Sequence, residues 1–302
     1  MSLVSDDSAD ARGLAEERAR LRAARRYNEA DRLRDRIKDL GFEVVDRPGG
    51  WELVRLVPAS KRRLRPKEVA SVLDLPATVD FSVHWLAGRW PEDVLRGIAS
   101  FRKFEGGPPA QHTVVETEVS PETEWPPDVE VVALAGDPGF GEERNAQLRR
   151  SRGRVVIVAD GSVEADGDVF TPLRAALSDR SVGIVGPMGI VTDDLSEFRD
   201  HEGPDVDAIE AYLLAFRREL LLEGIAFDPR FRFYRNADID FSFQVKALGL
   251  KAIRVDVPVH GHEHREWSTT PEQDRDRLSK RNFYRFLDRF RGRTDLLVNR
   301  GN

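Results

Sequence analysis

Short runs rich in β-branched residues alternate with helical stretches from about residue 77 onward. This alternation constrains the fold more than any other feature of the sequence. Stretches such as GEERNAQLRRS separate the runs, which are ATVDFSVHWL, HTVVETEV, VEVVALAG, RVVIVAD and VGIVGPM. Strands that alternate with helices of about 10 to 15 residues are typical of a mostly parallel sheet with helices on both faces. The sequence therefore predicts an α/β domain over residues 77–302.

The first part of the chain follows a different pattern. Apolar residues recur at steps of three, four or seven between Ala11 and Leu40, which predicts a helix or a helical hairpin. The run FEVVDRPGGWELVRL then predicts a β-hairpin that turns at Pro48-Gly49-Gly50. We assign residues 1–57 to this helical hairpin with its small β element. Residues 58–76, which contain a basic cluster and prolines, are expected to be a linker.

Composition excludes several classes of protein. A net charge of −6 gives no general reason to expect a polyanion as partner, and the absence of cysteine excludes disulfides and thiolate metal sites. No apolar run approaches the roughly 20 residues of a membrane span, and the N-terminus lacks the apolar core of a signal peptide. The expectation is a soluble cytoplasmic protein, and nothing in the sequence indicates an oligomeric state.

Asp160 directly follows the apolar run VVIVA. In parallel sheets ligands bind beyond the carboxyl ends of the strands, so Asp160 stands where a site is expected. A polar residue that caps a buried strand explains Asp160 equally well. The acidic residues that follow, Glu164, Asp166 and Asp168, are interpreted as a charged turn with Asp168 near a helix N-terminus.

Two further groups of polar residues lie late in the chain. Asp238, in NADID, stands at an expected helix start, where a carboxylate can be a catalytic base or a helix cap. His260, His262 and His264 alternate in VHGHEHREW and would share one face of a strand. Metal ligation by one of them, first of all His260, is one interpretation, and an exposed polar loop is the other.

Two long segments resemble a known family. GDPGFGEERNAQLRRSRGRVVIVADGSVEADGDVFTPLRAAL resembles the nucleotide-sugar half of a family 2 glycosyltransferase, where a Gly-rich loop leads to Arg-Asn and then to a D-x-D motif. AYLLAFRRELLLEGIAFDPRFRFYRNADIDFSFQVKALGLKAIRVDVPVHGHEHREW resembles its acceptor region, with an R-R-E helix, a G-x-F-D turn, an E-D-x-D and a late His in this order. The resemblance spans about residues 77 to 267. It implies a GT-A-like nucleotide-diphospho-sugar transferase fold.

The resemblance also implies roles for single residues. Asp160 takes the first D of D-x-D, which contacts ribose or metal, whereas Ser162 stands at the last D, the usual metal ligand. Asp238 takes the place of the catalytic base, and Ala237 replaces the Glu before it. The other expected donor-binding residues are Glu116, Arg144 and Asn145.

A divalent metal is the expected cofactor of such a site. Mg²⁺ or Mn²⁺ would bind through Asp160 with His260 or His262, weakly, since the hydroxyl of Ser162 is a neutral ligand. Asp160, Asp238 and at least one of His260 and His262 are therefore expected to converge on one cleft.

The leading hypothesis is an enzyme that transfers a sugar from a nucleoside diphosphate sugar to an unknown acceptor hydroxyl with inversion. Its alternative is a degenerate, non-catalytic GT-A domain that binds a nucleotide sugar or a partner. Ser162 and Ala237 favour the binding module, whereas Asp160, Asp238 and the histidines favour the enzyme. We adopt the enzyme as the working hypothesis.

The segment Glu16 to Leu53 resembles the small helical module that ends many cysteinyl-tRNA synthetases, and NEADRLRDRIKDLGFEVVD carries the resemblance. The sequence has no HIGH-like or KMSKS-like motif and no cysteine for a catalytic-core zinc. The resemblance therefore implies an appendage and no aminoacylation. RNA contact through residues 11–55, self-association and packing on the main domain are its open uses. Interleaved arginines and acids favour a salt-bridged solvated face over RNA.

Overall fold

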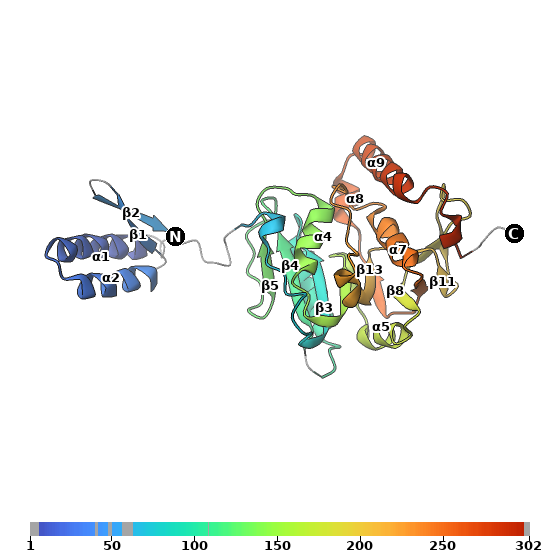
Figure 1. Cartoon of the computed structure of the whole chain (residues 1–302), viewed down its shortest axis with the longest axis horizontal. Coiled ribbons are helices and arrows are strands. Elements are labelled where there is room, and N and C mark those ends of the chain that lie inside the picture. The colour runs from blue at the N-terminus through green and yellow to red at the C-terminus, as the bar shows by residue number, and fades with distance from the viewer. Residues whose placement is uncertain (1–5, 40–41, 48–49, 56–62, 108, 299–302) are drawn as a thin grey trace. The chain divides into compact units, whose positions relative to one another are not determined.

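The computed structural model describes residues 6–39, 42–47, 50–55, 63–107 and 109–298. It divides the chain into two compact units, Met1–Arg62 and Arg63–Asn302 (Figure 1). Of the expected turn at Pro48-Gly49-Gly50, Pro48 and Gly49 lie outside the described residues, as does the first part of the expected linker, 58–62.

Two helices and a β-hairpin make up the first unit. Helices α1 (Asp6–Ala23) and α2 (Tyr27–Asp39) precede the antiparallel strands β1 (Phe42–Arg47) and β2 (Gly50–Arg55). Their apolar faces share a small core of Ala11, Ala15, Ile37, Phe42 and Val44. Several arginines of the two helices and of the turn between them pair with acids within the unit, which accounts for part of the interleaved charge.

The second unit begins earlier than the sequence suggested. Leu64 forms a parallel bridge with Leu134, and Leu64 and Val69 pack in a cluster with Val132, Leu134 and Ala146. The 3-10 helix η2 (Pro66–Glu68) belongs to the same segment. Residues 63–76 are therefore part of the second unit and not a linker, because Val69 is buried in this cluster and the backbone of Leu64 and Val72 bonds to the rest of the unit.

An eight-stranded sheet forms the centre of the second unit, in the order β11-β14-β8-β13-β6-β3-β4-β5. Strands β5, β4, β3 and β6 run parallel, as do β14 and β8, whereas β13 is antiparallel to both of its neighbours and β11 to β14. The strands are β3 (Val79–Leu86), β4 (Gln111–Glu116), β5 (Glu130–Ala133), β6 (Gly153–Ala159), β8 (Val182–Gly186), β11 (Asp205–Val206), β13 (Leu213–Arg217) and β14 (Lys251–Arg254). The predicted α/β fold is confirmed, with a mixed sheet.

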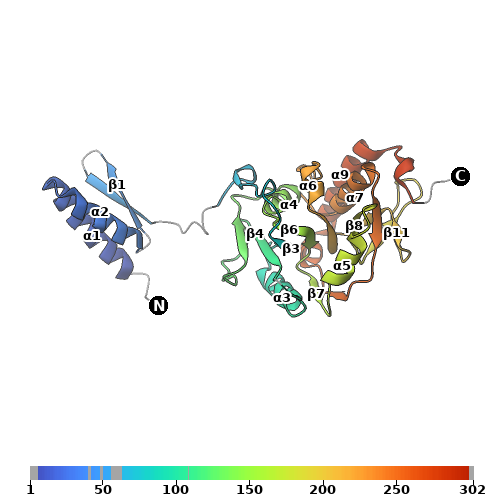
Figure 2. The same ribbon diagram turned by 60° about the horizontal axis from the view of Figure 1, so that its bottom comes forward.

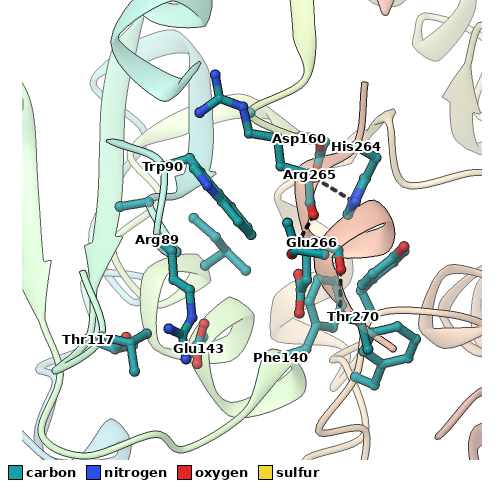
Figure 3. A pocket seen from close by; sticks show the side chains of 18 of the residues that line it. Arg89, Trp90, Thr117, Phe140, Glu143, Asp160, His264, Arg265, Glu266 and Thr270 are labelled. Atoms are coloured by element: carbon teal, nitrogen blue, oxygen red, sulfur yellow. Dashed lines mark hydrogen bonds and ion pairs between the residues drawn. The ribbon is translucent and has the colours of Figure 1, made fainter. Parts of the chain in front are cut away.

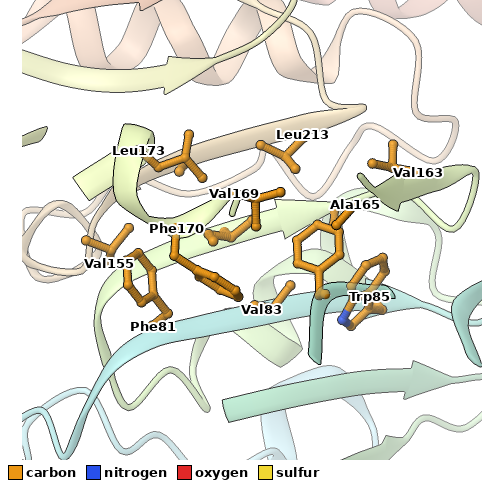
Figure 4. Close-up of a cluster of buried hydrophobic side chains, with 14 of the residues drawn as sticks. Phe81, Val83, Trp85, Val155, Val163, Ala165, Val169, Phe170, Leu173 and Leu213 are labelled. Carbon is orange, nitrogen blue, oxygen red and sulfur yellow. The ribbon is translucent and has the colours of Figure 1, made fainter. Parts of the chain in front are cut away.

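Alternation along β6 explains why helices cover both faces. Val155, Ile157 and Ala159 belong to one buried cluster, which Figure 4 shows, while Val156 and Val158 belong to another. Helices α3 (Pro91–Arg102) and α5 (Phe170–Leu177) contribute to the first cluster, and α4 (Phe140–Leu148), α6 (Glu219–Leu222) and α7 (Ala237–Ala247) to the second (Figure 2). Each Val, Leu or Phe buried in this way stabilises the fold by about 1.5 to 3 kcal/mol.

Smaller elements complete the unit at the edges of the sheet. Strands β9 (Gly189–Val191), β10 (Arg199–His201) and β12 (Ala208–Ile209) form a three-stranded sheet, and β7 (Val163–Ala165) pairs with β15 (Val259–Gly261). Helix α8 (Arg265–Thr269) precedes α9 (Glu272–Phe290), which packs Phe286 and Phe290 against Phe243 of α7, and η3 (Thr294–Leu296) follows. No helix in the described part of the chain is long and apolar enough to cross a membrane.

Candidate active site

A cleft of about 690 Å³ opens at the carboxyl edge of the sheet, where Asp160 follows β6. Leu86 at the end of β3 and Thr117 after β4 contribute to its lining, as do the residues that begin α8. A second cavity of about 370 Å³ adjoins it. Both cavities are lined by Arg144, Asp160, Tyr234 and His264, so these residues stand between the two.

Neighbouring residues hold the carboxylate of Asp160 in place. Its Oδ1 accepts hydrogen bonds from the backbone N–H of Ser162 at 2.9 Å and from the Ser162 hydroxyl at 2.5 Å. The backbone N–H of Asp160 donates to the carbonyl of Tyr212 at 3.0 Å, beside the start of β13. Ser162 is buried, and it acts here as a donor to Asp160 where a D-x-D motif would offer a second carboxylate.

His264 faces the same carboxylate from the other side. Its Nε2 lies 3.4 Å from Oδ2 of Asp160, and Figure 3 draws this contact as a dashed line. Nδ1 accepts a hydrogen bond from the backbone N–H of Trp267 at 3.2 Å, so the neutral ring carries its proton on Nε2. The ring of Tyr234 stacks on the imidazole with the centroids 4.4 Å apart. These contacts fix the orientation of His264 toward Asp160.

The two groups change each other's protonation. Burial alone would raise the pKa of Asp160, but hydrogen bonds from His264 and Ser162 outweigh it and lower this pKa to about 2. Burial likewise opposes the charged form of His264, yet the Asp160 carboxylate raises the pKa of His264 above its ordinary value. The carboxylate–imidazolium pair is therefore favoured over a wider range of pH than either charged group alone.

The buried side chain of Arg144 connects two neighbouring strands beside Asp160. Its guanidinium donates to the carbonyls of His84 on β3 and Ala159 on β6, each at 3.2 Å. Burial lowers the pKa of Arg144 to about 10, and Asp160 opposes this shift, so the side chain remains charged near neutral pH. The buried cation therefore offsets part of the charge of Asp160.

Two more acids with raised pKa values line the larger cleft. Burial, followed by the charges of Asp137 and Glu266, raises the pKa of Glu143 to about 7. Burial also raises the pKa of Glu266, and the charge of Asp160 adds to this effect. These carboxyl groups line the cleft together with the arginines Arg89, Arg232 and Arg265, so a ligand there meets charges of both signs.

Asp238 lines the second cavity together with Asp160. Its Oδ2 accepts the backbone N–H of Ala211 at 3.0 Å, and Ala211 directly precedes Tyr212, whose carbonyl accepts from Asp160. The backbone of Ala211 and Tyr212 thus binds the carboxylate of Asp238 and the backbone N–H of Asp160. Burial raises the pKa of Asp238, against the effect of its backbone hydrogen bonds.

Glu210 lines the same cavity as Asp160 and Asp238. Burial, followed by the charge of Asp238, raises the pKa of Glu210 to about 7, while Arg235 opposes the shift. Asp238 and Glu210 share this cavity, and raised pKa values such as theirs suit proton transfer to or from a bound hydroxyl.

Two expected donor-binding residues have other partners and line neither cavity. Glu116 accepts a hydrogen bond from Nε1 of Trp125 at 2.6 Å. Asn145 exchanges hydrogen bonds with the backbone of Phe227, donating to its carbonyl at 2.7 Å and accepting from its N–H at 3.0 Å. Both side chains therefore bond to neighbouring parts of the domain. Thr117, the residue after Glu116, lines the cleft instead of Glu116.

The expected combination of Asp160 with His260 or His262 is not found. Strand β15 pairs with β7, and this pairing turns the two imidazoles toward Glu164 and Asp166. Only after the strand ends does the chain bring His264 to Asp160. The structure thus brings together Asp160, Ser162, Arg144 and Asp238, and it replaces the expected histidine by His264.

Sequence reasoning missed Glu143, Glu210 and Glu266 altogether. Glu143 lies in the first turn of α4 after the glycine-rich loop, a position that could have drawn attention to it. Nothing in the local pattern distinguishes Glu210 or Glu266 from surface acids, because their burial depends on elements distant in the sequence.

The groups beside Asp160 fit a divalent cation that a phosphorylated ligand shares. Mg²⁺ and similar ions are commonly held by one or two carboxylates together with substrate phosphates. Asp160 offers a carboxylate, to which Ser162 donates, whereas both ring nitrogens of His264 already have partners in Trp267 and Asp160. Within the described residues, no group of three metal-ligating side chains converges at Asp160. The protein alone supplies too few ligands for tight binding.

Comparison with known proteins gives similarity in structure only. No family model matches the sequence, and no curated protein matches it. The chain resembles the structure of GalNAc-T7 with UDP, GalNAc and Mn²⁺ with a TM-score of 0.52 and 15% identity, over 70% of this chain and 48% of that one. It therefore spans about half the length of GalNAc-T7.

Two further structures are similar at lower scores. The mannosyltransferase PcManGT from Pyrobaculum calidifontis, in complex with GDP-Man and Mn²⁺, has a TM-score of 0.44 and 15% identity, covering 62% of this chain and 57% of that one. S. aureus TarS 1-349 in complex with UDP has a TM-score of 0.46 and 13% identity, covering 70% and 72%. The second unit has a mixed central sheet and is similar in structure to GalNAc-T7. It therefore has a GT-A-like glycosyltransferase fold.

Proposed function

We propose that the second unit binds a nucleoside diphosphate sugar in the cleft beside Asp160 and transfers the sugar to a hydroxyl acceptor in the adjoining cavity. The observation that carries the proposal is the common position of Asp160 and Asp238 on one cavity, beside the larger cleft. A donor site and an acceptor site must meet at the reacting carbon, and Asp160 lies at this junction.

The larger cleft suits the donor. Ala87 and Gly88 follow β3, and Thr117 follows β4. Their small side chains leave space for a nucleoside and leave backbone groups available for hydrogen bonds to it. Its volume of about 690 Å³ is within the range of about 300 to 1,000 Å³ that is usual for small-molecule sites. Asp160, held by Ser162 and His264, is placed to meet the ribose or the diphosphate.

The second cavity suits the acceptor. Tyr212, Tyr234 and Trp267 contribute to its lining, and aromatic rings are favourable surfaces for the apolar faces of a sugar or another ring. In the proposed reaction the acceptor oxygen attacks C1 of the sugar, and the bond from C1 to the diphosphate breaks. The hydroxyl proton passes to Asp238 as general base, and the nucleoside diphosphate leaves with its electron pair. Attack opposite the leaving group inverts C1.

A divalent cation would complete the donor site. Asp160 would hold Mg²⁺ or Mn²⁺ together with the diphosphate, and when bound the ion would neutralise the charge of the leaving group. Glu143, Glu266 and Asp160 would repel a diphosphate, and a cation would offset this repulsion together with the arginines Arg89 and Arg232 of the same cleft. Protonated Glu143 reduces the same repulsion near neutral pH.

A binding module without catalysis is the second candidate. It is favoured by the hydrogen bonds of Asp160, whose Oδ1 already accepts two bonds from Ser162 and is less available to a metal. The two candidates share the donor cleft and differ only in turnover.

The test combines binding with turnover. Calorimetry with UDP, GDP and dTDP and their sugars, with and without Mn²⁺, measures donor binding by the full chain. Release of nucleoside diphosphate from the sugar nucleotide that binds measures turnover. We expect Asp160→Asn to lose binding, and Asp238→Asn to keep binding but lose turnover. Asp256→Asn, at a highly exposed carboxylate with 91% of its side chain accessible, is the control and changes neither.

Each negative result has a distinct meaning. Binding without turnover in the wild type, across hydroxyl acceptors and water, would support the binding module. Absence of binding for every nucleotide would refute the donor site and both candidates with it.

A further inference from the structure

The ladder of β7 and β15 carries a second group of polar side chains. In this antiparallel pair His260 is the direct partner of Glu164, and Gly261 is the partner of Val163. Since side chains two residues apart point to the same face of a strand, His262 lies on the same face as His260. The ladder therefore gathers two imidazoles and one carboxylate on one side.

We propose that Glu164, His260 and His262 bind a transition-metal cation of the Zn²⁺ type, at a site distinct from the donor cleft. One ligand atom from each residue lies within 4.8 Å of the others. Nε2 of His262 is 2.9 Å from Oε1 of Glu164, and Nε2 of His260 is 4.0 Å from Oε2 of the same carboxylate. Three ligand atoms thus already face a common point.

Asp166 supports the orientation of one ligand. Its Oδ2 lies 2.8 Å from Nδ1 of His260, so that the proton of the ring is directed to Nδ1 and Nε2 remains free for a metal. Metal-binding histidines almost always donate their other ring N–H to a carboxylate, a carbonyl or water. A hydrogen-bonded histidine whose other nitrogen faces a Glu and a second His is therefore arranged as a ligand.

The donor set selects the class of metal. Imidazole nitrogen suits Zn²⁺, Cu²⁺ and Ni²⁺, whereas Mg²⁺ and Ca²⁺ prefer sites made of oxygen alone. Zn²⁺ with bonds of about 2.0 to 2.2 Å needs tetrahedral ligand atoms about 3.3 to 3.6 Å apart. Closing from within 4.8 Å requires side-chain movements on the order of 1 Å. The two imidazoles are 45% and 41% exposed, so water reaches the remaining coordination position.

Arg96 is the competitor for the carboxylate. Its Nε forms an ion pair with Oε1 of Glu164, and the same guanidinium also donates to Asp93 at 2.8 Å. Because Arg96 keeps Asp93 as a partner, it can release Glu164 when a dication binds. Replacing Arg96 should therefore strengthen metal binding, which is a specific consequence of this geometry.

The site is separate from the donor cleft but joined to it through the backbone. His260 and His262 line neither cavity around Asp160. The backbone N–H of His262 donates to the carbonyl of Ser162 at 2.7 Å, and the hydroxyl of Ser162 donates to Asp160. A cation that links β15 to β7 would reinforce this connection.

Calorimetry of Zn²⁺ with the full untagged chain tests the proposal in the absence of nucleotide. We expect one Zn²⁺ to bind per chain at this site. His260→Gln and His262→Gln should each weaken it at least tenfold, and the double variant should abolish it. Asp166→Asn should weaken it by about 10- to 100-fold, as is usual for groups that orient a ligand. Arg96→Gln should tighten it.

Matched histidine variants identify the site. His201→Gln, on β10, is the control for loss of one partly exposed imidazole and should leave the affinity unchanged. His264→Gln removes the imidazole of the donor cleft and should also leave it unchanged. Thermal melting without metal establishes that each variant is folded, and the Zn²⁺-induced rise in melting temperature gives a second readout.

Two results would overturn the proposal. One is the absence of Zn²⁺ binding by the wild type at millimolar metal. The other is binding that survives in the folded double variant, and loss with His264→Gln would then assign the ion to Asp160. Neither result depends on transferase activity, so the proposed function is tested independently.

Discussion

Nε2 of His264 lies 3.4 Å from Oδ2 of Asp160, and this contact joins the end of β6 to the start of α8. The contact is largely shielded from water, since 14% of the His264 side chain and 26% of the Asp160 side chain are accessible. A partly buried, charge-assisted contact is stronger than a surface ion pair. It therefore both orders the candidate active site and makes its stability depend on pH.

Removing His264 should reveal this dependence. The pKa of Asp160 is lowered to about 2, so its contribution to stability is present above pH 4 and is lost as pH falls toward 2. The pKa of His264 is raised, so its contribution is present below about pH 6.5 and is lost as pH rises through the folded-state pKa. His264→Gln should lower the free energy of unfolding by about 1 to 2 kcal/mol at pH 5.5 and by less at pH 9. Denaturant unfolding at the two pH values measures it, and an equal loss at both would contradict the assignment.

Glu143→Gln should stabilise the protein at high pH. Because the pKa of Glu143 rises to about 7 on folding, the folded state holds a proton that the unfolded state releases above about pH 4.5. The free energy of unfolding therefore falls between pH 4.5 and 7, and the whole of this loss persists above pH 7. The carboxyl is partly exposed, so we expect a gain of about 1 to 2 kcal/mol at pH 8 and almost none at pH 4. Glu142→Gln, the neighbour on α4, is the control in the same unfolding measurements.

Ser162→Asp should make the stability of the protein depend more strongly on added metal. The hydroxyl and N–H of Ser162 both donate to Asp160, and a second carboxylate there replaces one donor by a repelling charge. Without metal we expect a loss of about 1 to 3 kcal/mol in the free energy of unfolding. Mn²⁺ should restore more of the melting temperature in Ser162→Asp than in the wild type. Ser162→Ala loses the hydroxyl without adding charge, and an equal response of this variant to Mn²⁺ would argue against a metal at Asp160.

Asp238→Asn should separate binding from proton transfer. Loss of a general base typically lowers kcat by about 10²- to 10⁴-fold, and the amide keeps the size of the side chain. Donor affinity should change by less than about twofold, because Asp238 lines the second cavity and not the donor cleft. Glu210→Gln is the informative comparison. A larger loss of kcat in Glu210→Gln than in Asp238→Asn would assign the base to Glu210.

Asp46→Asn should destabilise the first unit. Arg18 is 2% exposed and makes two parallel hydrogen bonds to Asp46, at 3.0 and 3.1 Å. The neutral amide leaves the buried guanidinium without a matching charge. Since Asp46 itself is half-exposed, we expect a local cost of about 1 to 2 kcal/mol. Hydrogen exchange of α1 amides in the full chain measures it. Glu29→Gln, which removes an exposed pair with Arg26, is the control and should change protection little.

Local sequence patterns determined the elements of the main domain. The apolar run VVIVA, separated from the other runs by helical stretches, predicts a buried strand with helices on both faces, and its side chains do divide between two buried clusters. A strand that ends on Asp160 and a helix that begins beside Asp238 are likewise visible in the sequence. These features depend on the period of neighbouring residues and on the position of a polar group at an element's end.

Pairing between distant segments was decided only by the tertiary structure. Three alternating histidines are equivalent as a pattern, yet two face Glu164 because β15 pairs with β7 in one register, and the third reaches Asp160 because the strand has ended. The position of antiparallel β13 between β6 and β8 and the packing of Leu64 and Val69 likewise depend on contacts between distant segments. Burial of Glu143 and Glu210, which shifts their pKa values, also arises from elements that the local sequence does not contain. The sequence by itself determines which groups are available, and long-range packing decides which of them meet, because strand register and burial are set by contacts between segments far apart in the chain.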